Sequence, residues 1–106
     1  MAPAFLASIS DLTALVRRLQ RNWKDDVIIC SSAAELPSLP RAESVYFVVS
    51  QLSMCSTAFQ QLVLDTLPLV EESRRKLFRL DDAKIPIGFA ALQSLPEDPI
   101  VRGSTL

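Results

Sequence analysis

The stretch that most constrains the fold is RKLFRLDDAKIPIGFAAL, at positions 75–92. As a strand, residues 76–80 would point Lys76, Phe78 and Leu80 to one face and Leu77 and Arg79 to the other. The mostly polar residues 81–84 are typical of a turn, and a returning strand would point Ile85, Ile87, Phe89 and Ala91 to one face. Gly88 lies within that second strand and indicates a bulge or a close approach of backbone or ligand. The pattern predicts a β-hairpin.

The whole chain, 1–106, is predicted to be one domain, because 106 residues suffice for a single core. An internal loop is expected over 31–43, where two prolines disfavour a long helix, and a tail over 96–106. The predicted fold class is α+β. A small antiparallel sheet is built around the central hairpin at 75–92 and packed by one or two helices.

Apolar residues recur at helical spacing early in the chain and predict an amphipathic helix. Its apolar stripe includes Leu12, Leu15, Leu19 and Trp23. Such a stripe usually faces the core of its own domain, and it is also suited to docking a partner helix. We therefore consider it both as part of the core and as a partner surface.

Two further apolar segments are expected to be buried. Residues 27–30 are predicted to form a short strand, whereas 44–52 suit a strand or a buried helix equally well. Ser56 or Thr57 is placed to cap a helix that follows, and Pro68 to end or kink it.

The chain contains no histidine, which excludes imidazole-based dyads and triads and zinc sites that need histidine. Cys30 and Cys55 lack the spacing of a metal site, so we expect structural thiols and neither metal nor cofactor. A formal net charge of −1 argues against nucleic-acid binding. We expect no secretory signal and no transmembrane segment, and hence a cytoplasmic protein.

The segment TLPLVEESRRKLFRLDDAKIPIGFAALQSL, at 66–95, resembles the toxin-activating lysine acyltransferases of the hemolysin-activating type. The matching residues are Leu67, Pro68, Glu71, Leu77, Arg79, Asp81 and the run 85–90. The resemblance extends over about 44–95 when the upstream spacing is included. It implies a cytoplasmic protein with a truncated GNAT-like acyltransferase fold that works with acyl carrier protein in toxin activation.

The same resemblance implies that the family's chemistry is missing. The position of the family's catalytic histidine is Met54 when counted back from Leu67, or Ser53 when counted forward from Ser50. Neither side chain can replace the histidine as a base. The family's aspartate and the tryptophan of its S-W-A motif have no counterpart, so we do not expect an enzyme that uses the family mechanism.

Three functions follow from these observations. The first is a non-catalytic relative of the acyltransferases, an accessory protein that binds a protein partner or acyl carrier protein in a groove. That groove would be bordered by Met54, Thr57, Gly88 and Phe89. The second is a small regulatory protein-interaction module without this ancestry, which docks through the helix stripe.

The third function is an acyltransferase with a non-histidine base, in which Cys55 or Ser53 is the nucleophile. In each case a homodimer is expected, because so small a sheet leaves an edge strand and an apolar face uncovered.

Overall fold

The computed structural model of the chain describes residues 2–23 and 26–97. Four strands form one sheet in the order β2-β1-β3-β4. The strands are β1 (Ala4–Leu6), β2 (Ile28–Cys30), β3 (Val45–Val49) and β4 (Arg75–Arg79). All three pairings are parallel, with Phe47 opposite both Leu6 and Leu77.

The prediction of an antiparallel sheet around a central hairpin is therefore wrong. Only the first half of the 75–92 stretch is a strand, and β4 pairs in parallel with β3. The second half forms a 3-10 turn, η5 (Ile87–Phe89), and one turn of helix, α4 (Ala90–Gln93). Pro86 precedes this turn and has no N–H to donate to a strand ladder. A short strand-like sequence predicts a strand but does not specify its pairing partner.

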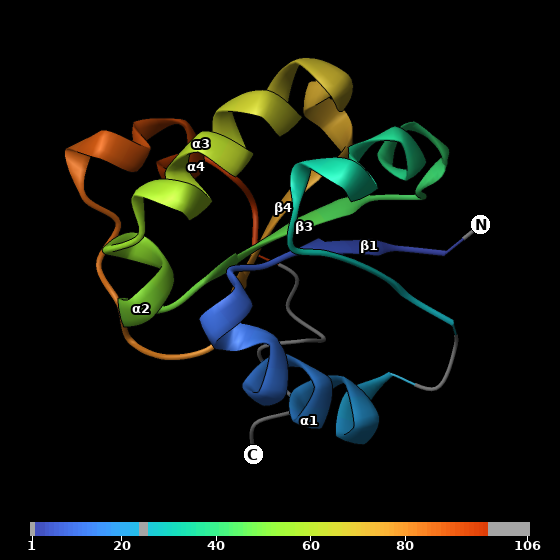
Figure 1. The fold of residues 1–106 in the computed structure, drawn as a ribbon, viewed down its shortest axis with the longest axis horizontal. Helices are drawn as coiled ribbons and strands as arrows, with labels where there is room; N and C mark the ends of the chain where they lie inside the picture. The colour runs from blue at the N-terminus through green and yellow to red at the C-terminus, as the bar shows by residue number, and fades with distance from the viewer. Residues whose placement is uncertain (1, 24–25, 98–106) are drawn as a thin grey trace.

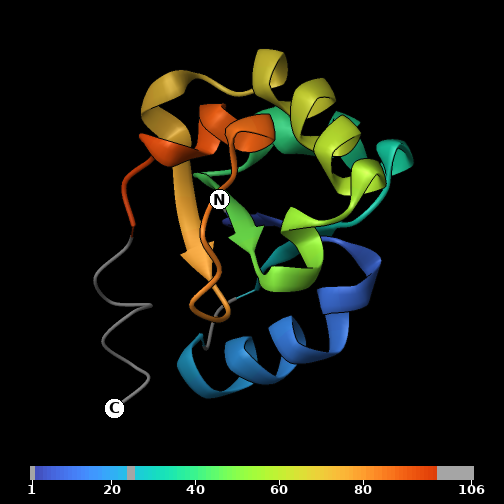
Figure 2. The ribbon, with the colours of Figure 1, turned by 90° about the vertical axis from the view of Figure 1, so that its left-hand side faces the viewer.

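The sheet is covered on both faces, as parallel sheets usually are. Helix α1 (Leu12–Asn22) lies on one face, and the other helices lie on the opposite face or at its edge (Figures 1 and 2). These other elements are the 3-10 helix η2 (Ala33–Arg41) and the helices α2 (Gln51–Met54) and α3 (Thr57–Thr66), followed by α4. The described residues also include the short 3-10 turns η1 (Ile9–Asp11), η3 (Leu67–Leu69) and η4 (Glu72–Arg74).

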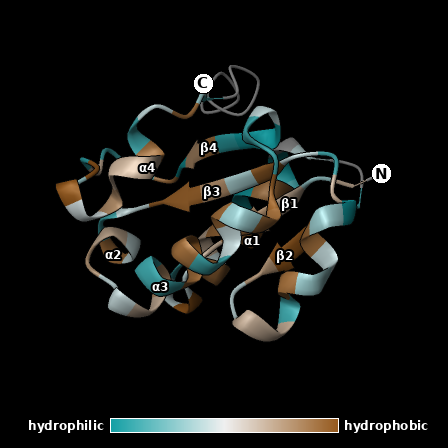
Figure 3. Cartoon of the chain, turned by 90° about the horizontal axis from the view of Figure 1, so that it is seen from above, coloured by the Kyte–Doolittle hydropathy of each residue, from teal (hydrophilic) through white to brown (hydrophobic). Residues whose placement is uncertain are grey.

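Two hydrophobic cores result from the alternation of side chains along the strands. Leu6, Phe47 and Leu77 point to the core under α3 and η2. Their neighbours in sequence point to the core under α1, where Phe5 stacks on Tyr46 with ring centroids 4.8 Å apart. All five residues of β3 are buried, and Figure 3 shows hydrophobic colour along this strand. The segment 44–52 thus contains a central strand followed by the start of α2.

The predicted N-terminal helix is confirmed as α1, and its apolar stripe belongs mainly to the second core. Leu15 and Leu19 are buried, and Leu12 and Trp23 are partly buried against the same core. The Trp23 ring contacts Phe5 edge-to-face at 5.3 Å. These side chains serve the domain's own packing.

Other local predictions have mixed outcomes. The strand at 27–30 and the helix capped near Ser56 are both present. Most of the predicted loop 31–43 is the 3-10 helix η2, which accommodates two prolines. The predicted tail, 96–106, lies mostly outside the described residues.

Candidate functional site

Serine residues follow the first three strands at their carboxyl ends. Ser8 comes shortly after β1, Ser31 directly after β2 and Ser50 directly after β3. The chain leaves β1 towards α1 on one face and leaves β3 towards α2 and α3 on the other (Figure 1). In open parallel sheets, ligands bind outside the carboxyl ends of the strands where the connections change face in this way. This edge is therefore the expected position of a binding site.

A buried carboxylate connects the segment that follows β1 to the segment that follows β3. Asp11 is 3% exposed, and its Oδ2 accepts hydrogen bonds from Ser8 Oγ at 3.0 Å and from Ser50 Oγ at 2.6 Å. Ser50 also caps α2, since its Oγ accepts from the Ser53 N–H at 2.9 Å. A carboxylate removed from water requires such donors. The network fixes the loop after β1 against the loop after β3.

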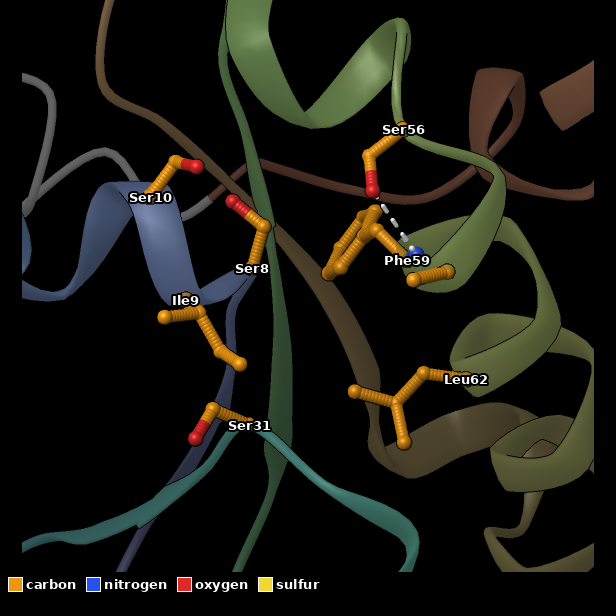
Figure 4. Close-up of a pocket in the computed structure, with 8 residues that line it drawn as sticks. Ser8, Ile9, Ser10, Ser31, Ser56, Phe59 and Leu62 are labelled. Atoms are coloured by element: carbon orange, nitrogen blue, oxygen red, sulfur yellow. Dashed lines mark hydrogen bonds between the residues drawn. The ribbon is translucent and has the colours of Figure 1, made fainter.

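A pocket of about 120 Å³ lies beside this network (Figure 4). One wall comes from the loop after β1 and from the end of β2, and the other comes from the start of α3. The lining residues are Ser8, Ile9, Ser10, Ser31, Ser56, Ala58, Phe59 and Leu62. The pocket thus combines four hydroxyl groups with an apolar wall, of which Phe59 and Leu62 are the buried members.

Local hydrogen bonds hold both walls in place. Ser56 Oγ accepts from the Phe59 N–H at 3.1 Å and thereby caps α3. Glu35 Oε1 accepts from the Ser31 N–H at 2.9 Å and holds the residue after β2. These contacts make the pocket a preformed feature of the fold.

Size and charge limit what the pocket can bind. None of the eight lining residues is charged, and the ionisable groups bonded to them, Asp11 and Glu35, are both acidic. Sites for phosphate normally supply lysine, arginine or several backbone N–H groups. Drug-sized ligands occupy roughly 300–1,000 Å³, whereas a cavity of about 150 Å³ accommodates benzene. The pocket is suited to one uncharged group of side-chain size.

Of the four residues predicted to border a groove, two are buried and two are exposed. Met54 and Phe89 are buried in one core, where the Phe89 ring lies 6.2 Å from that of Phe59. The Gly88 carbonyl accepts from Gln60 Nε2 at 2.9 Å, so the close approach expected at this glycine is to Gln60. Thr57 is exposed on the first turn of α3.

The two predicted nucleophiles lie in different environments, and no described residue is hydrogen-bonded to either of them as a base. Ser53 is fully buried, and its hydroxyl contacts the carbonyls of Val48 at 3.3 Å and Ser50 at 3.2 Å. Cys55 is an exposed free thiol after α2. Cys30 is buried, and burial raises the pKa of its thiol. Within 2–23 and 26–97, no cluster of three or more acidic, cysteine or histidine side chains could hold a metal ion.

Comparison of the chain with protein-family models, with curated proteins and with solved structures gives no significant match. The resemblance to toxin-activating acyltransferases therefore stays a prediction. None of the described helices has the length and apolar character needed to cross a membrane.

Sequence reasoning missed the pocket at the carboxyl edge. The available signal was a serine after each of several apolar segments, at Ser8, Ser31 and Ser50. That signal identifies a shared edge only when the strands are known to be parallel.

Proposed function

We propose that the chain is a non-catalytic protein-binding domain whose binding site is the pocket at the carboxyl edge. The observation that carries this proposal is the pocket itself, which is uncharged, preformed and of side-chain size. Phe59 and Leu62 offer an apolar wall for one aliphatic side chain of a partner. The hydroxyls of Ser10 and Ser31 are placed at the pocket to bond the partner's backbone amides.

The state of the polar groups favours binding over catalysis. General acid–base chemistry needs a group that can exchange a proton with a substrate. Asp11 is buried and already accepts two serine hydroxyls, and Ser53 is committed to the cap of α2. The acyltransferase alternative with Ser53 or Cys55 as nucleophile thus lacks an activating base in the described structure.

The proposal keeps the general role expected from the sequence, an accessory protein that binds another protein. An acyl carrier protein partner and a part in toxin activation stay predictions from the resemblance. Asp81 bonds the Gln51 N–H at 3.1 Å and, with Asp82, adds negative charge next to α2. This charge disfavours a strongly acidic partner at the same edge.

Selection of displayed peptides on the immobilised chain tests the proposal. We expect selected peptides to share one aliphatic or aromatic anchor position. Ala58→Trp introduces a bulky ring at the exposed rim of the pocket and should weaken these peptides about tenfold or more. Ala14→Trp, at an exposed position of α1 on the other face, is the matched control and should leave binding unchanged. Selected peptides that bind both variants equally would overturn the proposal.

A further inference from the structure

We propose that the group that fills the pocket is Ile9 of a second copy of this chain. Two copies would form a symmetric dimer in which each Ile9 side chain enters the pocket of the other. This inference rests on the proposed function, because it names the partner of the same site.

Ile9 has the properties of an anchor residue. It lies on η1 directly after Ser8 and is 73% exposed, although its side chain lines the pocket (Figure 4). The turn that carries it is held by the buried bond from Ser8 to Asp11. An apolar side chain presented on a fixed turn loses little conformational freedom when it is buried by a partner.

The pocket has room for that anchor. Its volume of about 120 Å³ is somewhat below the roughly 150 Å³ cavity that holds benzene, so a branched four-carbon side chain is of suitable size. Phe59 and Leu62 provide the apolar contacts. Ile9 is both exposed and one of the lining residues, so the anchor and the pocket lie together (Figure 4).

A surface that carries both the anchor and its receptor is self-complementary. In a dimer with two-fold symmetry, the same patch of each copy meets its counterpart, so a contact from Ile9 to the pocket is made twice. Residues near the axis also face their own copies, and like charges there repel. The lining residues carry no charge, which suits them to such an axis, whereas Asp81 and Asp82 next to α2 would face their own copies at the same edge and weaken the dimer. The exposed side of α1 is less suitable, since it carries Arg17 and Arg21.

A second exposed apolar residue enlarges the proposed interface. Leu52 is 61% exposed on α2, and α2 packs against the turn that carries Ile9. A patch built around two apolar residues is smaller than a standard interface of about 1,600 Å². We therefore expect a weak dimer, with a dissociation constant on the order of 10–100 µM.

Analytical ultracentrifugation of the full chain tests this inference. The wild type should dimerise as its concentration approaches about 1 mM. Ile9→Asp should raise the dissociation constant about 100-fold, because two anchors worth roughly tenfold each are lost. Ile87→Asp is the matched control, since Ile87 is 90% exposed and does not line the pocket. It should dimerise as the wild type does. Circular dichroism of each variant checks that it is folded.

Two results would overturn the dimer. One is a wild type that stays monomeric to about 1 mM, and the other is an equal loss of dimer in Ile9→Asp and Ile87→Asp. A monomeric chain that still selects peptides dependent on the pocket overturns the dimer and leaves the proposed function intact. Failure of both the dimer and the pocket-dependent peptides overturns the proposed function as well.

Discussion

The Ser50 hydroxyl donates a hydrogen bond of 2.6 Å to Oδ2 of Asp11, a residue 39 positions earlier in the chain. This bond joins the loop after β1 to the loop after β3. The same carboxylate oxygen accepts from Ser8, which lines the pocket. One buried carboxylate thus fixes the part of the sheet edge from which the proposed binding site is built.

Loss of this carboxylate should be costly. Asp11→Ala leaves the hydroxyls of Ser8 and Ser50 without their acceptor, and we expect the free energy of unfolding to fall by about 2–4 kcal/mol. Urea denaturation measures the change. Asp82→Ala, at an exposed carboxylate, is the control and should change stability by less than about 0.5 kcal/mol. Equal losses in the two variants would contradict a structural role for Asp11.

The cap of α3 should also contribute measurably. Ser56→Ala removes the acceptor of the Phe59 N–H and should lower the free energy of unfolding by about 1 kcal/mol. Ser56→Asp should retain most of that stability, because aspartate caps helices as well as serine does. If thermal denaturation showed the two variants to be equally destabilised, the cap would not be the cause.

Replacement of two large apolar residues distinguishes the parallel sheet from the predicted hairpin. A hairpin would bury Ile87 on the core face of its second strand, whereas the structure leaves this residue 90% exposed. We expect Ile87→Ala to change the free energy of unfolding by less than about 0.5 kcal/mol. Phe78→Ala removes a ring that is 1% exposed and should cost about 3–5 kcal/mol. A large loss on Ile87→Ala would contradict the observed fold.

The two cysteines should differ in reactivity. Cys55 is exposed and Cys30 is buried, so a thiol reagent should modify Cys55 in the folded chain and Cys30 only on unfolding. Mass spectrometry of peptides after brief alkylation gives the sites. Rapid modification of Cys30 under native conditions would contradict its placement in the core.

Burial of Cys30 also predicts a dependence of stability on pH. Desolvation raises the pKa of this thiol above its ordinary value of 9.0, so above that pH the folded state retains a proton that the unfolded state releases. The thiol's contribution is therefore complete below pH 9.0 and declines as the pH rises above it. Cys30→Ala should show a smaller decline than the wild type in urea denaturation at alkaline pH, and Cys55→Ala should show the wild-type decline.

Local features of the fold could be predicted from the sequence. The helical stripe through Leu15 and Leu19 and the short strand through Leu77 and Phe78 are properties of short segments. The cap at Ser56 is equally local. The pairing of β4 was not predictable in this way, because its partner residues in β3 lie 30 positions earlier and a strand's side-chain pattern is the same for either pairing direction. The apolar residues 85–87 resemble a strand in sequence. Pro86, however, has no N–H to donate to the hydrogen bonds between strands.

The site was less predictable than the fold. Its lining residues come from the loop after β1, the end of β2 and the start of α3, which become neighbours only through the strand order. The sequence predicts a groove at Gly88, with a close approach of backbone or ligand. In the structure, this glycine does approach another segment closely. That segment is the Gln60 side chain of the same chain.

Nuclear magnetic resonance of the ¹⁵N-labelled chain tests the central claim, that the carboxyl-edge pocket is a protein-binding surface with a second copy as its partner. Amide spectra recorded as the protein concentration rises report which residues enter an interface. We expect the amide chemical shifts to change mainly at Ser8–Ser10, at Ser31 and at Ser56–Leu62. Changes confined to the exposed side of α1 around Arg17 and Arg21, or spectra independent of concentration, would contradict it.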